Sequence, residues 1–109
     1  KELSMIKDIS FLEDSNDRYS NFWLTTISLN KDSVIDKETL RLQLAKDNIE
    51  SRPLWKPMHC QPVFKNCKSY VNGVSEDLFS RGLCLPSGTN LKVEDLKRVV
   101  KKIKVLYEV

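Results

Sequence analysis

The apolar run FWLTTISL at residues 22–29 restricts the possible folds more than any other feature of this sequence. Aromatic, β-branched and other apolar residues follow one another almost without interruption, which is typical of a β-strand. Because polar residues do not alternate with apolar ones, both faces of such a strand must be covered at least in part by other elements. The run therefore predicts the central strand of a sheet.

Shorter apolar segments predict the other strands. ISFL at residues 9–12 forms one of them, and the polar stretch EDSNDRYSN between it and the central strand is a loop. GLCLP at residues 82–86 predicts a brief buried strand that ends at Pro86. Ile49 begins a short extended segment that leads into a proline-rich stretch.

The first helix is predicted at residues 36–47, DKETLRLQLAKD. Asp36 can cap its first turn, and Asn48 stands where a left-handed residue commonly ends a helix. The apolar stripe of this helix consists of Leu40, Leu44 and Ala45. Such a stripe indicates packing on a sheet.

Two further helices are predicted towards the C-terminus. The shorter covers residues 75–81 and is closed by Gly82, and the longer covers roughly residues 92–107. The longer helix has one apolar face and one lysine-rich face. Lysines could bind nucleic acid, but no basic strand with interleaved aromatic residues and no helix-turn-helix pattern accompanies them, so the sequence favours an ordinary solvated face.

The predicted order of elements is strand, strand, helix, strand, helix, strand, helix. At 109 residues, the chain is near the commonest size of a single domain. We predict an α+β fold over residues 1–109, in which a small antiparallel or mixed sheet carries helices on one face.

The composition excludes several classes of protein. Apolar residues make up 40% and charged residues 30% of the chain, as in ordinary globular domains. The net charge of +3 is too small to imply a nucleic-acid partner, and no apolar run reaches the ~18–20 residues of a membrane span. Three irregularly spaced cysteines favour reduced thiols in the cytoplasm. The chain begins with Lys-Glu-Leu rather than Met, so we expect a piece of a longer protein.

One histidine and three cysteines raise the question of a zinc site. Zinc ligands usually come in closely spaced pairs, whereas His59 and Cys60 are adjacent and Cys67 and Cys84 lie far apart. Neighbouring side chains of an extended segment point to opposite faces, so the first two should diverge. The spacing favours incidental cysteines over a metal site, and no third group is evident for a nucleophilic Cys60–His59 pair.

The segment ESRPLWKPMHCQ at residues 50–61 is unusually stiff. Pro53 and Pro57 fix their own φ angles and hold the preceding residues out of a helix. The segment displays a guanidinium, an indole, an ammonium and an imidazole group, from Arg52, Trp55, Lys56 and His59. Such groups suit an anionic ligand with a flat ring, but they also suit a structural loop with a packed tryptophan and a paired arginine. The residues alone leave both interpretations open.

Two long blocks of the sequence resemble a known family. ESRPLWKPMHCQPVF, followed by YVNGVSEDLFSRGLCLPSGTNLKVEDLKRVVKKI, is similar to the C-terminal part of DegT-type nucleotide-sugar aminotransferases. The resemblance extends over essentially the whole chain and is greatest to the branch acting on uridine-diphosphate 4-keto sugars. It implies the small C-terminal domain of a pyridoxal-phosphate enzyme with the aspartate-aminotransferase fold.

The resemblance also implies where the chemistry lies. In this family the cofactor lysine, the phosphate-binding residues and the acidic partner of the pyridine nitrogen belong to a large N-terminal domain, which this chain lacks. We therefore expect pyridoxal phosphate in the full-length enzyme but not on this fragment, which alone should be inactive. The expected partners are the chain's own large domain, a homodimer partner and a nucleotide sugar that receives an amino group, commonly from glutamate.

The same resemblance implies substrate contacts for residues of the stiff segment. Arg52 or Lys56 is expected to meet the pyrophosphate, and Trp55 or His59 to line the sugar or base pocket. Ser87 and Gly88, which follow the buried strand, are expected to border the same cleft. Two alternatives remain: a stand-alone module that binds a phosphorylated or nucleotide ligand without chemistry, and a domain that only completes the fold and dimer of its parent.

Overall fold

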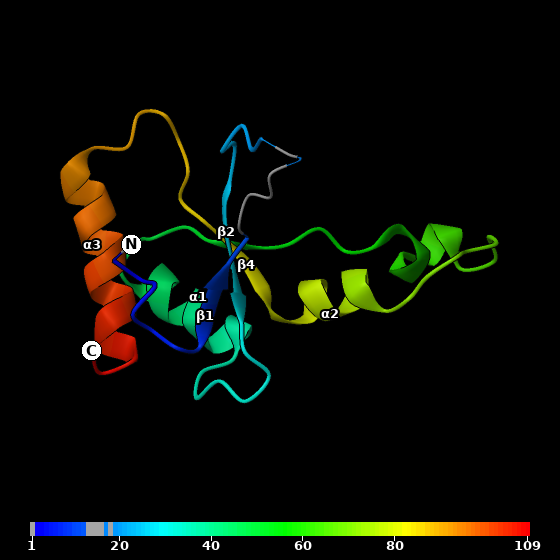
Figure 1. The fold of residues 1–109 in the computed structure, drawn as a ribbon, viewed down its shortest axis with the longest axis horizontal. Helices are drawn as coiled ribbons and strands as arrows, with labels where there is room; N and C mark the ends of the chain where they lie inside the picture. Colours follow the sequence, from blue (N-terminus) through cyan, green and yellow to red (C-terminus); the bar gives the residue numbers. More distant parts are fainter. Residues whose placement is uncertain (1, 13–16, 18) are drawn as a thin grey trace.

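The computed structural model describes residues 2–12, 17 and 19–109, which form a four-stranded antiparallel sheet with helices (Figure 1). The strands lie in the order β1-β2-β4-β3. Along the chain the elements are β1 (Ile9–Phe11), β2 (Thr25–Leu29), α1 (Lys37–Lys46), β3 (Arg52–Pro53), the 3-10 turns η1 (Met58–Cys60) and η2 (Pro62–Phe64), α2 (Val74–Arg81), β4 (Gly82–Leu85) and α3 (Val93–Leu106). The predicted α+β architecture is confirmed, and its sheet is antiparallel throughout.

The hydrophobic core lies between one face of the sheet and the helices α1 and α3. Ile27 and Leu83 are register partners on the central strands β2 and β4 and are almost completely buried. The helices contribute the side chains that cover them, namely Leu40, Leu44, Val99 and Ile103. Alternation along β4 directs Cys84 to the opposite face, which no core helix covers.

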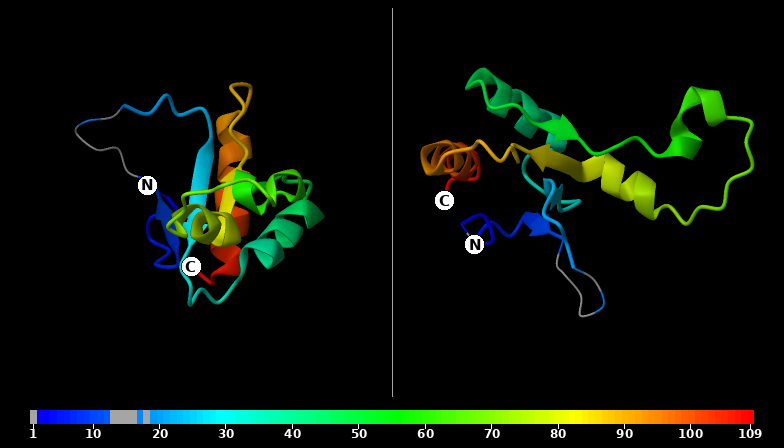
Figure 2. Two further views of the ribbon diagram at one scale, coloured as in Figure 1. Left: turned by 90° about the vertical axis from the view of Figure 1, so that its right-hand side faces the viewer. Right: turned by 90° about the horizontal axis from the view of Figure 1, so that it is seen from above.

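Helix α2 does not lie on the sheet with α1 and α3. It continues the line of β4 outwards, and the segment 54–73 runs beside it to form a projection on the side of the sheet away from α3 (Figures 1 and 2). None of the residues of η1, η2 or α2 is fully buried. The prediction of helices on one face therefore holds for α1 and α3, whereas polar contacts hold the projection together.

The ends of the long helices agree with the capping residues in the sequence. Asp36 accepts hydrogen bonds from the backbone N–H groups of Glu38 and Thr39 at 2.8 Å. Asn48 has the predicted left-handed conformation, with φ at +54°. Helix α3 begins with an N–H bond from Lys92 to the Asp95 carboxylate, 3.0 Å long.

Two predictions of local structure are wrong. The central strand starts at Thr25 rather than at residue 22, because Phe22 has a φ of +50° that interrupts an extended chain. Pro53 and Pro57 hold Arg52 and Lys56 out of a helix as predicted. Beyond Pro57, however, the stretch is not extended, because Pro57 and Pro62 introduce the turns η1 and η2. The predicted loop at residues 13–21 lies partly outside the described residues. Within the described ranges, no helix is both long and apolar enough to cross a membrane.

Candidate functional site

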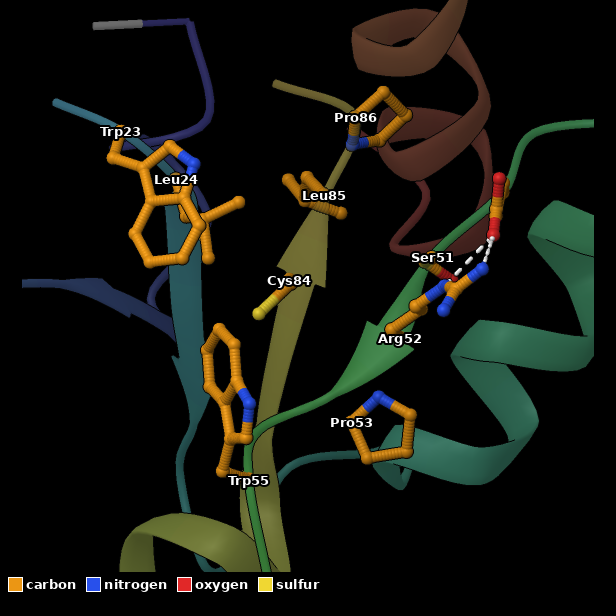
Figure 3. A pocket seen from close by; sticks show the side chains of 10 residues that line it. Trp23, Leu24, Ser51, Arg52, Pro53, Trp55, Cys84, Leu85 and Pro86 are labelled. Carbon is orange, nitrogen blue, oxygen red and sulfur yellow. Dashed lines mark hydrogen bonds and ion pairs between the residues drawn. The ribbon is translucent and has the colours of Figure 1, made fainter. Parts of the chain in front are cut away.

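A cavity of about 370 Å³ opens beside Cys84, on the face of the sheet opposite the core (Figure 3). Its wall comes from three parts of the chain: the segment before β2, the segment around β3, and the end of β4. The lining residues are Trp23, Leu24, Glu50, Ser51, Arg52, Pro53, Trp55, Cys84, Leu85 and Pro86. We call this cavity the tryptophan pocket.

The short edge strand β3 positions the cationic side of the pocket. Arg52 is the register partner of Cys84, so both side chains leave the sheet on the same face. Pro53 follows at the edge, where a residue without an N–H group costs no ladder hydrogen bond. The pairing of only two residues is thus enough to place the guanidinium beside the pocket.

Trp23 and Trp55 form the aromatic side of the pocket. Their ring centroids lie 6.1 Å apart with an angle of 38° between the ring planes. Both residues are mainly solvent-exposed, at 69% and 67% of their surface, although large aromatic rings are usually covered. Two open indole faces beside a cavity are suited to hold a flat ring of a ligand.

Arg52 is available for an anionic ligand. Its guanidinium donates two hydrogen bonds to one oxygen of Glu50, at 2.6 and 2.8 Å (Figure 3). The side chain is 79% exposed, and ion pairs in such positions contribute little to stability. A phosphate could replace the carboxylate at small energetic cost and accept a bidentate bond.

The Cys84 thiol and the Ser51 hydroxyl of the pocket are not activated for reaction. Burial raises the pKa of the Cys84 thiol above its usual range, so the group is neither a thiolate nor a nucleophile near neutral pH. The Ser51 hydroxyl oxygen is buried and has no hydrogen-bond partner among the described residues. The pocket is therefore suited to bind and orient a ligand.

The structure places the other predicted site residues outside the pocket lining. The backbone carbonyl of Lys56 accepts a hydrogen bond from the Gln61 side chain, and the Lys56 side chain is exposed. Ser87 accepts a bond from the Thr25 N–H and donates one to the Leu85 carbonyl, both 2.7 Å long, which fastens the chain just beyond the pocket rim. Gly88 follows in an exposed turn.

His59 lies away from the tryptophan pocket, in the projection. Its Nε2 is 2.9 Å from the Glu76 carboxylate, and the residue lines a separate cavity of about 270 Å³. Cys60 also reaches Glu76, with 3.6 Å between Sγ and Oε1. The prediction that His59 and Cys60 diverge is wrong, because a 3-10 turn rotates successive residues by about 120° instead of alternating them.

Comparison with known proteins identifies the family. Residues 1–104 match the sequence pattern described as the DegT/DnrJ/EryC1/StrS aminotransferase family. The chain belongs to this family. The resemblance expected from the proline-rich and C-terminal blocks is thereby confirmed.

The relatives support the same family at the level of sequence and fold. A protein named as the pyridoxal phosphate-dependent aminotransferase EpsN of Bacillus subtilis is 38% identical over 109 residues, covering 96% of this chain and 28% of that protein. A GDP-perosamine synthase of Vibrio cholerae is 29% identical over 84% of this chain and 25% of its own length. The crystal structure of a DegT/DnrJ/EryC1/StrS aminotransferase from Brucella abortus superposes with a TM-score of 0.80 at 25% identity, covering 99% of this chain and 28% of that structure. This member of the DegT family thus spans about a quarter of its relatives.

The lining of the tryptophan pocket does not fit pyridoxal phosphate. That cofactor needs a lysine for covalent attachment together with groups for its phosphate and its ring nitrogen. Among the described residues, no lysine lines the tryptophan pocket. Burial lowers the pKa of Lys37, but its ammonium donates to the Phe79 carbonyl and lies 4.2 Å from the centre of the Phe79 ring. The Lys37 ammonium group of this DegT-family chain is thus already occupied by Phe79.

Sequence reasoning missed Trp23 and Glu50 as pocket residues. Trp23 belongs to an apolar run that predicts a buried strand, and only the position of Trp55 across the pocket reveals its other role. Glu50 begins the same block as Arg52, so its charge two residues away was a usable indication of a local pair.

Proposed function

We propose that this chain is the C-terminal small domain of a pyridoxal-phosphate-dependent aminotransferase that transfers an amino group, from glutamate, to a nucleotide-linked keto sugar. The large domain of the same protein would hold the cofactor and the reacting lysine. The chain alone would then be inactive, and the intact enzyme would be a cytoplasmic homodimer. Three free cysteines support a reducing compartment.

One observation carries the proposal beyond family membership: Trp23, Trp55 and Arg52 line a single pocket. Two exposed indole rings match the flat base of a nucleotide sugar, and a guanidinium that can exchange its carboxylate partner for a phosphate matches the pyrophosphate. In this proposal Arg52 binds phosphate and the indoles hold the base or sugar. Lys56 lies next to Trp55 along the chain and could add charge, while Ser87 and Gly88 border the cleft.

The test is the Arg52→Ala variant of the full-length enzyme. Loss of a charge-assisted hydrogen bond of about 1.5–3 kcal/mol should lower kcat/KM for the nucleotide sugar by about 10- to 150-fold. UDP- and GDP-linked keto sugars should both be assayed, since the pocket geometry does not distinguish the bases.

The matched control is Arg41→Ala, which removes an arginine from a similarly local pair with Glu38 on α1. Arg41 does not line the tryptophan pocket, so this variant should keep the kcat/KM of the parent enzyme. An unchanged kcat/KM for Arg52→Ala would remove Arg52 from the substrate site.

The rival proposal of a binding module without chemistry is separated by the reaction itself. If the full-length protein binds nucleotide sugars but transfers no amino group from glutamate in the presence of pyridoxal phosphate, the module is the better description. Binding can be followed by intrinsic fluorescence, because both tryptophans of the chain line the pocket.

A further inference from the structure

A second cluster of chemically active side chains lies in the projection, away from the tryptophan pocket. His59 and Cys60 extend from η1, and Glu76 extends from the first turn of α2. One potential ligand atom from each residue lies within 4.8 Å of the others. The His59 and Cys60 side chains therefore both approach the Glu76 carboxylate, which lies 17 and 16 residues further along the chain.

The local structure fixes both sides of this cluster. Pro57 begins η1, and the Gln61 side chain donates to the Lys56 carbonyl across the turn at 3.0 Å. On the other side, Gly73 immediately precedes α2 and has a φ of +82°, a left-handed conformation that favours glycine. The ligand groups are thus held by two short rigid elements rather than by free loops.

The distances suit a small tetrahedral metal ion. Zinc binds nitrogen and oxygen at about 2.0–2.1 Å and thiolate sulfur at about 2.3 Å, which separates N from O by about 3.3 Å and S from O by about 3.6 Å. Here the His59 Nε2 to Glu76 Oε1 distance is 2.9 Å and the Cys60 Sγ to Glu76 Oε1 distance is 3.6 Å. The third pair, His59 Nε2 and Cys60 Sγ, lies within 4.8 Å. The ion fits once the N–O pair widens to about 3.3 Å and the N–S pair stands at about 3.6 Å.

The ligand types select zinc among common metals. Imidazole, thiolate and carboxylate together are typical of zinc, whereas magnesium and calcium prefer oxygen ligands only. The His59 side chain is 19% exposed and that of Glu76 is 47% exposed, so a fourth position remains open to water.

We propose that His59 Nε2, Cys60 Sγ and Glu76 Oε1 form a three-ligand zinc site that fastens η1 to α2. Zinc replaces the thiol proton of Cys60, which is released to solvent, and it binds the His59 tautomer that carries its proton on Nδ1, so that Nε2 has a free lone pair. Metal–ligand bonds thereby replace the two hydrogen bonds to Glu76. The proposal is independent of the nucleotide-sugar function, and a metal-bound His59 would not contact the substrate.

The test is a titration of the reduced 109-residue chain with Co²⁺, a coloured substitute for zinc. We expect one equivalent to produce a thiolate-to-cobalt charge-transfer band that Zn²⁺ abolishes. His59→Ala, Cys60→Ser and Glu76→Gln should each weaken binding by at least about tenfold. Cys67→Ser is the control, because that exposed thiol lies outside the cluster and its loss should change nothing.

A second measurement keeps the test decisive if a variant is poorly folded. Saturating Zn²⁺ should raise the Tm of the parent chain, since an ion that binds only the folded state stabilises it. This rise should persist in Cys67→Ser and disappear in Glu76→Gln. Absence of a charge-transfer band in the parent chain, or equal Co²⁺ affinity of Cys60→Ser and the parent, would overturn the proposal.

Discussion

Gly82 illustrates how a single residue limits this fold. It stands where α2 ends and β4 begins, and it is buried. A Cβ atom there would lie 2.6 Å from the Leu78 carbonyl oxygen and would also collide with the Leu54 side chain. We expect Gly82→Ala to lower the free energy of unfolding by about 1–3 kcal/mol, because the backbone oxygen cannot move aside cheaply.

Urea denaturation measures this change, and Gly88→Ala is the matched control. A Cβ at Gly88 would approach only the side-chain oxygen of Asn90, which can rotate away. The control should therefore stay within about 0.5 kcal/mol of the parent chain. Equal effects of the two alanines would contradict the steric account.

The sequence predicted single residues well where their roles are local. Asp36 as a cap and Asn48 as a left-handed residue follow from nearby backbone geometry, and both are confirmed. The role of Trp23 could not be predicted in this way, because only its partner across the pocket distinguishes an exposed indole from a core residue. Glu76 escaped notice for the same reason, since its neighbours in space are 16 and 17 residues away.

At the scale of elements, polar contacts join α2 to the sheet. Asp77 accepts hydrogen bonds from Arg81, which also donates to Ser28 and to the Leu29 carbonyl of β2. Lys31 lies 3.5 Å from the Asp77 carboxylate. The base of the projection is thus an ionic network in place of a hydrophobic core.

This network predicts a pH-dependent stability. The Arg81 hydrogen bond, with smaller contributions from its charge and from Lys31, lowers the pKa of Asp77 below its ordinary value of about 3.9. A lowered folded-state pKa contributes stability above the unfolded value, and this contribution is lost as the pH falls through the folded value. Asp77→Asn should therefore have a lower Tm than the parent chain at pH 7, and the two values should converge below about pH 4.

Thermal unfolding between pH 7 and pH 3 measures this convergence. Asp32→Asn serves as the comparison, because it removes an exposed carboxylate from the nearby loop that precedes α1. A Tm difference for Asp77→Asn that persists unchanged to pH 3 would show that the carboxylate charge is not what holds α2.

The positions of α1, α3 and β4 were predicted to within one or two residues, because periodicity, caps and Pro86 mark them. The turns η1 and η2 were not, since a proline-rich stretch is compatible with both extended and 3-10 geometry. Whether the sheet is antiparallel or mixed was likewise not decided by the sequence. The short strands contain no information on which strands pair or in which register.

At the scale of the whole molecule, large exposed apolar side chains gather in two places. Trp23 and Trp55 line the tryptophan pocket, and Val93, Leu96 and Val105 line a second cavity beside α3. Contiguous exposed apolar surface commonly marks an interface. This surface is consistent with the proposal that a large domain and a second subunit cover the chain in the intact enzyme, and with the coverage of about a quarter of its relatives.

The proposal that the large domain holds the cofactor predicts how the 109-residue chain responds to pyridoxal phosphate. A stable aldimine requires a lysine amine beside a site that holds the cofactor phosphate and ring, and no described lysine lines the tryptophan pocket. After borohydride reduction, mass spectrometry should detect only scattered, substoichiometric adducts on surface lysines. The full-length enzyme, as a positive control, should carry one stoichiometric adduct outside this chain. A stoichiometric adduct at Lys37, whose pKa burial lowers, would place cofactor chemistry on this domain, and its absence in Lys37→Arg would confirm that position.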